Sequence, residues 1–238
     1  MLSVIIPTLN EEKYLPFLLE AIKNQDFNDD YEIIVADANS EDRTVEIAKN
    51  YGCKIVPGGI PSKGRNQGAE FASGDLFLFL DADNIYLPEN FLEKLLKEFK
   101  ERDLEIATFP ICPNGNKFDK LAYGIYNFWA RLTQNFLPHA TNAILVKKEI
   151  HHKISGFDEE IKIGEDHVYA RTAAKIGKFG FAKIEPVLTS TRRFDRDGRL
   201  KTYLKYLLAG AYMFFLGPVK SDIFKYRFNH CSKNKKKL

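Results

Sequence analysis

Residues 73–84 read Ser-Gly-Asp-Leu-Phe-Leu-Phe-Leu-Asp-Ala-Asp-Asn. The unbroken apolar run from Leu76 to Leu80 is typical of a strand buried on both faces of a parallel sheet. Asp81 and Asp83 follow it, and positions i and i+2 of a strand point to the same side. Ligands bind at this carboxyl edge in open α/β sheets. Two close carboxylates repel each other there, which favours a divalent cation that binds both of them and bridges substrate phosphates. The alternative is that the two residues form a solvated turn in which Asp83 caps the next helix.

Strand and helix patterns alternate four times in the first 100 residues. This order predicts an α/β fold with a doubly wound, mostly parallel sheet flanked by helices. The expected strands cover residues 4–6, 31–37, 53–56, 76–80, 104–109, 143–146, 178–181 and 187–189. Helices are expected after a Thr8 or Asn10 cap, from about Gly64, from Pro88, over the aromatic-rich residues 118–136, and from Gly164. We expect residues 1–198 to form one domain and residues 199–238 a basic, partly apolar helical extension with a Lys-rich tail.

The composition is that of an ordinary globular protein, with 45% hydrophobic and 28% charged residues among 238. The three cysteines, Cys53, Cys112 and Cys231, are scattered and lack metal-ligand spacing, which predicts free thiols in a reducing compartment. The first residues enter a strand at once, without a basic leader or a cleavage site, so no signal peptide is expected. Together these features favour a cytoplasmic protein.

The net charge of +3 conceals an asymmetry. Residues 199–238 hold ten Lys or Arg and one acidic residue, whereas residues 1–198 hold 25 basic and 31 acidic residues. Residues 206–219 are apolar, too short a run for the roughly 20 residues of a membrane span. This basic and apolar end fits either peripheral contact with an anionic membrane surface or ordinary packing on the domain.

Polar side chains follow four successive strands and should converge at one edge of the sheet. Their residue types suit a nucleotide, because an Asp that ends the second strand can accept from a base or a ribose and basic groups suit phosphates. Glu165 and Asp166 open a later helix, where a carboxylate can be a general base or simply a favourable first-turn acid. The converging residues are Thr8, Asn10 and Glu11, then Asp37 and Ser40, then Lys63 and Arg65, and finally Asp81 and Asp83.

The order of these motifs resembles glycosyltransferase family 2. The similar segments are residues 3–11 (Ser-Val-Ile-Ile-Pro-Thr-Leu-Asn-Glu), residues 37–40 (Asp-Ala-Asn-Ser), residues 63–68 (Lys-Gly-Arg-Asn-Gln-Gly), Asp81-Ala82-Asp83 and Gly164-Glu165-Asp166. The resemblance covers about residues 2–195. It implies a GT-A type fold, with a Rossmann-like nucleotide-binding half and an acceptor half. It also implies inverting transfer from a UDP- or GDP-sugar with Mg²⁺ or Mn²⁺.

The resemblance further implies roles for individual residues. Asp166 would take the proton of the acceptor hydroxyl, with Glu165 beside it, and Asp83 with Asp81 would hold the metal. The remaining donor-site residues would be Pro7, Thr8, Asn10, Glu11, Asp37, Ser40, Lys63, Arg65, Ala82, Arg192 and Arg193.

The chain departs from the processive members of that family. Thr191-Arg192-Arg193-Phe194 stands where they carry Gln-x-x-Arg-Trp, which argues against a polymerising synthase. The aromatic residues 118–136 and the basic, apolar C-terminal end suggest a hydroxyl acceptor that is lipid-linked or lies at a membrane surface. Arg192 and Arg193 either contact the diphosphate or lie on the surface. His139 either lines the donor site, ligates the metal or is structural.

Two other enzyme classes would require different motifs in the sequence. A sugar nucleotidyltransferase would need a Gly-rich, basic loop after the first strand, and a dinucleotide oxidoreductase would need Gly-x-Gly-x-x-Gly. Neither pattern is found there. A catalytically silent nucleotide-binding module remains the alternative from a different class, and no nucleic-acid partner is expected.

Overall fold

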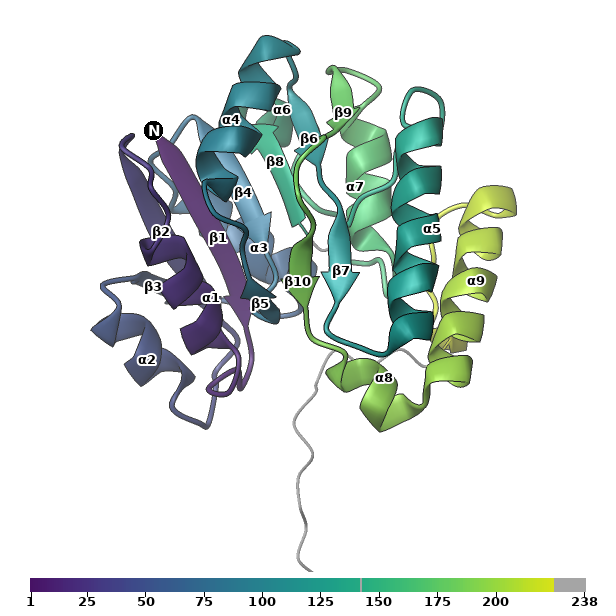
Figure 1. The fold of residues 1–238 in the computed structure, drawn as a ribbon, viewed down its shortest axis with the longest axis horizontal. Coiled ribbons are helices and arrows are strands. Elements are labelled where there is room, and N and C mark those ends of the chain that lie inside the picture. The colour runs from purple at the N-terminus through teal and green to yellow at the C-terminus, as the bar shows by residue number, and fades with distance from the viewer. Residues whose placement is uncertain (142, 225–238) are drawn as a thin grey trace, which may run out of the picture.

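The computed structural model describes residues 1–141 and 143–224, in which a mixed sheet of seven strands forms the centre (Figure 1). The strand order is β3-β2-β1-β4-β8-β6-β9, and β8 is antiparallel to both of its neighbours. This confirms the expected mostly parallel α/β sheet. The strands are β1 Leu2–Thr8, β2 Tyr31–Asp37, β3 Lys54–Pro57, β4 Leu76–Leu80, β6 Ile106–Thr108, β8 Ala143–Lys147 and β9 Phe179–Phe181.

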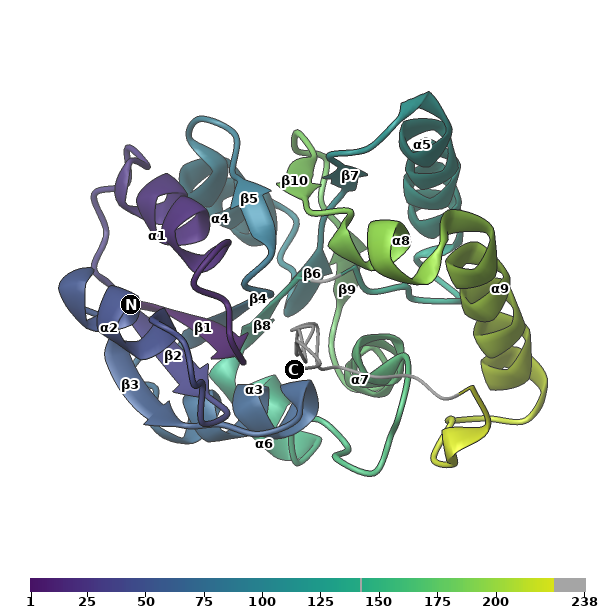
Figure 2. The ribbon, with the colours of Figure 1, turned by 90° about the horizontal axis from the view of Figure 1, so that it is seen from below.

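Helices cover both faces of this sheet, as an unbroken apolar strand requires. Phe77 and Phe79 of β4 lie in the cluster formed with α3, α6 and α7, while Leu78 and Leu80 pack in the cluster with α1, α2 and α4. The helices are α1 Leu15–Lys23, α2 Thr44–Asn50, α3 Pro61–Glu70, α4 Phe91–Glu101, α6 Lys148–Lys153 and α7 Glu165–Ala173. The carboxyl ends of β1, β2 and β4 therefore meet at one edge, seen from below in Figure 2.

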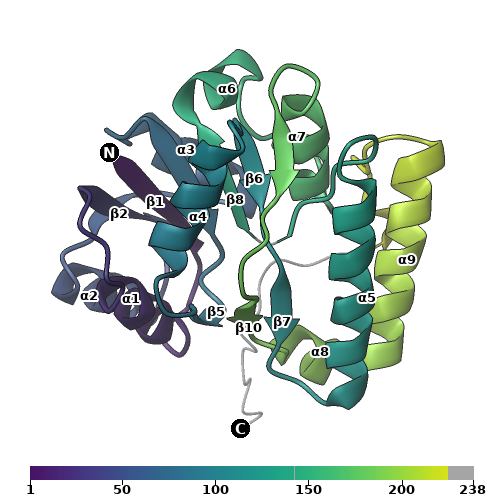
Figure 3. The ribbon, with the colours of Figure 1, turned by 45° about the horizontal axis from the view of Figure 1, so that its top comes forward.

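A second, smaller sheet and its helices extend the carboxyl edge of the central sheet. A three-stranded sheet of order β5-β10-β7 leads into three further helices (Figure 3). The elements are β5 Asn84–Tyr86, β7 Ile111–Pro113, β10 Val187–Thr189, α5 Lys117–Thr133, α8 Arg192–Asp197 and α9 Arg199–Phe215. Figures 1 and 2 show α5 and α9 side by side at the end of the molecule away from β3. A short 3-10 helix, Asp222–Phe224, follows.

Three expected helix starts are wrong. Helix α1 begins at Leu15 after Tyr14, without a side-chain cap, because Thr8 and Asn10 bond the neighbouring strand-end loop instead. Helix α4 begins at Phe91, after Pro88.

Helix α3 also begins earlier than expected, at Pro61, whose fixed φ suits the first helical position. Lys63 and Arg65 therefore lie on a helix and not in a Gly-rich turn. The helix packs so closely on β1 that a Cβ at Gly68 would lie 2.3 Å from Cγ2 of Ile5.

Cys53 and Cys112 are free thiols, as expected, whereas Cys231 and the Lys-rich tail lie outside the described residues. Among residues 1–141 and 143–224, no helix has both the length and the apolar character needed to cross a membrane.

Candidate functional site

A cavity of about 1250 Å³ lies where the carboxyl ends of β1 and β4 meet α5, α7, α8 and α9. One side is polar and comes from the loops after β1 and β4 and from the start of α7. The other side is largely apolar and comes from α5 and α9. Most of the residues selected from the sequence line it: Pro7, Thr8, Glu11, Arg65, Asp81, Ala82, Asp83, His139, Glu165, Asp166, Arg192 and Arg193.

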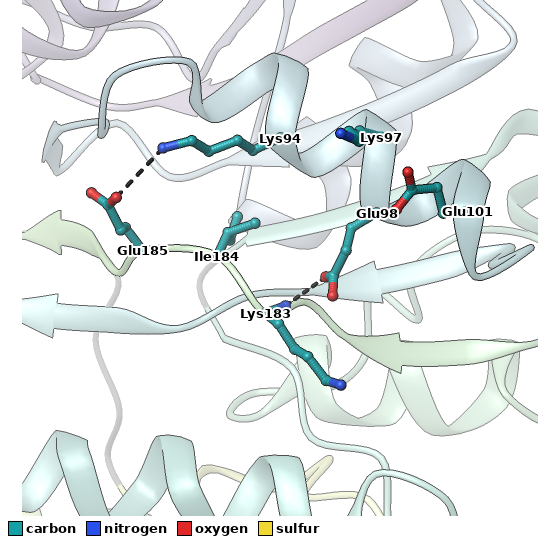
Figure 4. A pocket seen from close by; sticks show the side chains of 7 residues that line it. All are labelled: Lys94, Lys97, Glu98, Glu101, Lys183, Ile184 and Glu185. Atoms are coloured by element: carbon teal, nitrogen blue, oxygen red, sulfur yellow. Dashed lines mark hydrogen bonds and ion pairs between the residues drawn. The ribbon is translucent and has the colours of Figure 1, made fainter.

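A smaller hollow of about 340 Å³ lies between α4 and residues 183–185 (Figure 4). Charged side chains dominate it: Lys94 pairs with Glu185 at 3.4 Å, and Glu98 accepts from the backbone N–H of Lys183 at 2.5 Å. These contacts fasten α4 to the chain entering β10. The hollow shares no lining residue with the large cavity.

The two carboxylates after β4 both face the large cavity, and each meets an arginine. Asp81 Oδ1 accepts from Arg65 Nη2 at 2.7 Å, and Asp83 Oδ2 lies 3.4 Å from Arg192 Nε. Burial raises the pKa of Asp83; Arg192 opposes this shift, and the nearby Asp81 adds to it. The alternative that Asp83 caps the next helix is wrong, because α4 begins only at Phe91.

Arg65 is the cation at the centre of this polar side. It is 4% exposed, and its guanidinium joins Asp81 to Glu165, whose Oε1 lies 2.9 Å from Nη1. The guanidinium also lies 5.2 Å from the centre of the Phe157 ring. Burial alone would lower the pKa of Arg65, but the carboxylates of Asp81 and Glu165 outweigh it, so the pKa is raised. Arg65 therefore stays charged and holds the loop after β4 against the start of α7.

Asp166 lines the same cavity one residue beyond Glu165. Its Oδ1 accepts from the backbone N–H of His167 at 2.8 Å. Burial raises the pKa of Asp166 to about 6, with the positive charge of Arg65 opposing the shift. A carboxylate of this kind is ionised near neutral pH and accepts a proton more readily than an exposed one.

Glu11 and Arg192 form a bidentate ion pair across the cavity. Arg192 Nη1 and Nη2 donate to the carboxylate of Glu11 at 2.5 and 2.6 Å, and the guanidinium lies 4.8 Å from the centre of the Tyr14 ring. Burial raises the pKa of Glu11 to about 7, although Arg192 opposes it. Arg193 donates to the hydroxyl of Tyr206 at 2.9 Å, which links α8 to α9.

The residues after β2 form a bonded cluster behind the lining. The Thr8 and Ser40 hydroxyls donate to Oδ1 of Asp37 at 2.9 and 2.5 Å, and the backbone N–H of Asn10 donates to Ser40 Oγ at 2.8 Å. Of this cluster Thr8 lines the cavity, while Asn10, Asp37 and Ser40 do not, and the exposed Lys63 also lies outside the lining.

His139 lines the cavity beside His167, with the ring centres 5.5 Å apart. Burial lowers the pKa of each ring to about 4, so both are neutral near pH 7. In the part of the chain that the structure describes, no three His, Cys, Asp or Glu side chains are arranged to hold a metal ion. Asp81 and Asp83 nevertheless suit a hard cation, because their oxygens face one cavity and their mutual repulsion would be relieved.

The sequence did not point to many of the residues that line the apolar side of the large cavity. The aromatic density of residues 118–136 was noted, yet the spacing that turns Tyr123, Tyr126 and Trp129 toward the cavity was not used. The other lining residues that the sequence did not single out include His167, Arg171, Tyr203, Tyr206, Met213 and Phe214.

The fold and sequence were compared with known proteins. An uncharacterized glycosyltransferase, MJ1057 of Methanocaldococcus jannaschii, is 32% identical over 228 residues, covering 89% of this chain and 77% of its own. The poly(ribitol-phosphate) beta-N-acetylglucosaminyltransferase TarS of Staphylococcus aureus is 28% identical over 188 residues, which are 72% of this chain. The match spans 32% of TarS, so this chain corresponds to about a third of that protein.

Solved structures show the same architecture. TarS residues 1–349 with UDP-GlcNAc superpose with a TM-score of 0.66 at 22% identity, covering 80% of this chain and 58% of that one. The mannosyltransferase PcManGT of Pyrobaculum calidifontis with GDP-Man and Mn²⁺ gives 0.63 at 19% identity, covering 88% and 63%. These likenesses confirm the expected GT-A type fold. The sequence profile described as glycosyl transferase family 2 matches residues 3–157, well over half of the chain. This protein therefore belongs to glycosyl transferase family 2.

Proposed function

We propose that this protein transfers a sugar, with inversion, from a nucleotide-diphospho-sugar to an acceptor hydroxyl. The observation that carries the proposal is the shared cavity of Asp81, Asp83 and Asp166, with Arg65 tying the first of them to the start of α7. In this proposal a proton acceptor and a phosphate-binding edge would surround one space.

The donor would lie along the polar side. Thr8, which bonds Asp37 behind the lining, would meet the nucleoside, while Arg192 and Arg193 would meet the diphosphate. Asp81 and Asp83 would hold Mg²⁺ or Mn²⁺, which when bound neutralises the charge of the departing diphosphate. Related structures hold UDP-GlcNAc in one case and GDP-Man with Mn²⁺ in the other, so both UDP and GDP donors are candidates.

Asp166 would act as the general base. Its carboxylate takes the proton from the acceptor hydroxyl as the oxygen attacks the anomeric carbon. The new carbon–oxygen bond forms on the face opposite the bond to the diphosphate, which breaks, so the anomeric configuration inverts. The pKa of about 6 suits this role near neutral pH.

The acceptor is proposed to carry an apolar part and to receive one sugar at a time. Tyr123, Tyr126, Trp129, Leu207 and Phe214 line the side of the cavity opposite the donor edge. Such a surface suits a lipid-linked acceptor handled at a membrane. The similarity to TarS, a poly(ribitol-phosphate) beta-N-acetylglucosaminyltransferase, makes a cell-envelope glycan a further candidate.

Titration calorimetry with UDP and GDP, with and without Mn²⁺, tests the donor site. One nucleotide should bind only with the metal, and Asp83→Asn should lose this binding, whereas the exposed Asp75→Asn should keep it. Asp166→Asn should bind the nucleotide like the wild type yet release no nucleoside diphosphate from nucleotide-sugars. Retained turnover in Asp166→Asn would remove it as the base. Binding of neither nucleotide by a folded sample would reject the UDP or GDP donor.

A further inference from the structure

Helix α5 turns its apolar side toward solvent. Phe118, Leu121, Ile125, Phe128 and Leu132 recur at helical spacing, and each is at least 60% exposed. The inward side of the helix carries Asp119, Ala130 and Thr133 instead. Single exposed apolar residues are common, but a continuous exposed stripe marks an interaction surface.

Helix α9 also turns an apolar side toward solvent. Leu200, Leu204, Leu207, Phe214 and Phe215 form a second stripe, each more than half exposed, while Thr202, Ala209 and Met213 face inward. A helix that packed its hydrophobic side onto the domain would show the opposite arrangement.

The two stripes form one surface, here named the α5–α9 face. Asp119 of α5 accepts from Arg199 Nε at 2.9 Å and from the Tyr203 hydroxyl at 3.0 Å, both on α9. The rings of Phe118 and Tyr203 lie 5.5 Å apart. These contacts join the N-terminal parts of the two helices, which lie side by side in Figures 1 and 3.

Within the two helices, the exposed charged side chains are all positive. Asp119 is the one acidic residue within the two helices, and it is buried and paired. Lys117, Lys120, Arg131 and Lys201 are exposed around the stripes. Residues 225–238, which lie outside the described residues, contain six Lys or Arg and no acidic residue in the sequence.

We propose that the α5–α9 face docks this protein on a membrane surface that contains anionic phospholipid. Apolar side chains would enter the headgroup boundary while the cations meet lipid phosphates. Two copies packed through this face would bring like charges together, which disfavours self-association.

The docking would serve the proposed transfer, and this step rests on the proposed function. Leu207 and Phe214 belong to the face and also line the cavity, as does the half-exposed Trp129 of α5. The apolar end of the cavity therefore opens where the bilayer would lie, so a lipid-borne hydroxyl can reach Asp166 without leaving the membrane.

Vesicle flotation of the full chain tests the docking, with neutral phosphatidylcholine vesicles and with vesicles that also contain phosphatidylglycerol. The test variants are Phe118→Ser/Phe128→Ser and Leu204→Ser/Phe215→Ser, which leave the cavity lining intact. The matched control is Phe17→Ser/Phe71→Ser, since both phenylalanines are exposed on other parts of the molecule. Lys120→Gln/Lys201→Gln tests the charge.

The wild type and the control should float with anionic vesicles, and each face variant should lose about tenfold or more in partition coefficient. The lysine variant should show a weaker preference for anionic over neutral vesicles than the wild type does, by about tenfold or more. UDP and GDP binding, measured without lipid, should be unchanged in every variant with a native melting transition. This readout separates failure of the docking from failure of the proposed donor site. A wild type that does not float, face variants that float like the control, or a wild-type dimer that the face variants make monomeric would each overturn the proposal.

Discussion

The Arg65→Met substitution should weaken the fold and also shift the pH dependence of sugar transfer. Arg65 is buried between Asp81 and Glu165, whose side chains are 32% and 10% exposed. Removing one partner of a buried ion pair costs about 3–5 kcal/mol, because the remaining charge is left without compensation. Asp81 is the more exposed of the two, so water screens part of its charge. We therefore expect a loss of about 3 kcal/mol in the free energy of unfolding.

The second effect acts on Asp166. Arg65 opposes the upward shift that burial imposes on the pKa of Asp166, which is about 6. Without Arg65 the pKa should rise further, and the acid limb of the pH–rate profile should move to higher pH.

Urea denaturation at about pH 8 measures the first effect, and nucleoside diphosphate release as a function of pH measures the second. Arg43→Met is the matched control, because Arg43 forms a similar forked pair with Glu46 on the surface and should leave both readouts unchanged. A loss below about 1 kcal/mol for Arg65→Met would contradict the assigned cost of the buried pair. An unmoved acid limb would refute the coupling between Arg65 and Asp166.

Three other outcomes are expected. Transfer by the wild type should fall as the pH drops below about 6, since Asp166 must be ionised to accept a proton; initial rates across this range check it. At about pH 8 the buried carboxyl of Asp166 is ionised, which destabilises the fold because burial favours the protonated form. Asp166→Asn should therefore raise the free energy of unfolding at this pH by about 1–3 kcal/mol, and the gain should shrink as the pH falls below about 6. Urea midpoints at two pH values test this. Gly68→Ala should lower the free energy of unfolding by about 1–3 kcal/mol, because the new Cβ would clash with Ile5. Gly124→Ala on α5 should raise it by about 0.5–1 kcal/mol, because a Cβ there meets no atom within 4 Å and Ala favours the helix. Thermal melts of the two variants test this pair of predictions.

Local patterns were enough for the central sheet and its polar edge. The apolar run Leu76–Leu80 can be stable only between two layers of helices, and the structure places it there. Asp81 and Asp83 follow that strand directly, so their place at the cavity required only knowledge of where the strand ends. The order of the short motifs was likewise sufficient to identify the family.

Local sequence patterns could not predict which residues far apart in the chain pair with each other. Arg65 meets Glu165 across 100 residues, and Arg192 meets Glu11 across 181, because chain crossovers bring separate loops to one edge. The start of α1 was misplaced because bonds between loops replaced the expected cap, and the start of α3 because Pro61 takes the first helical position. An amphipathic pattern also does not reveal which side of a helix is covered. The outward apolar stripes of α5 and α9 became visible once packing had buried Asp119 and Thr202 and left Phe128 and Leu207 in solvent.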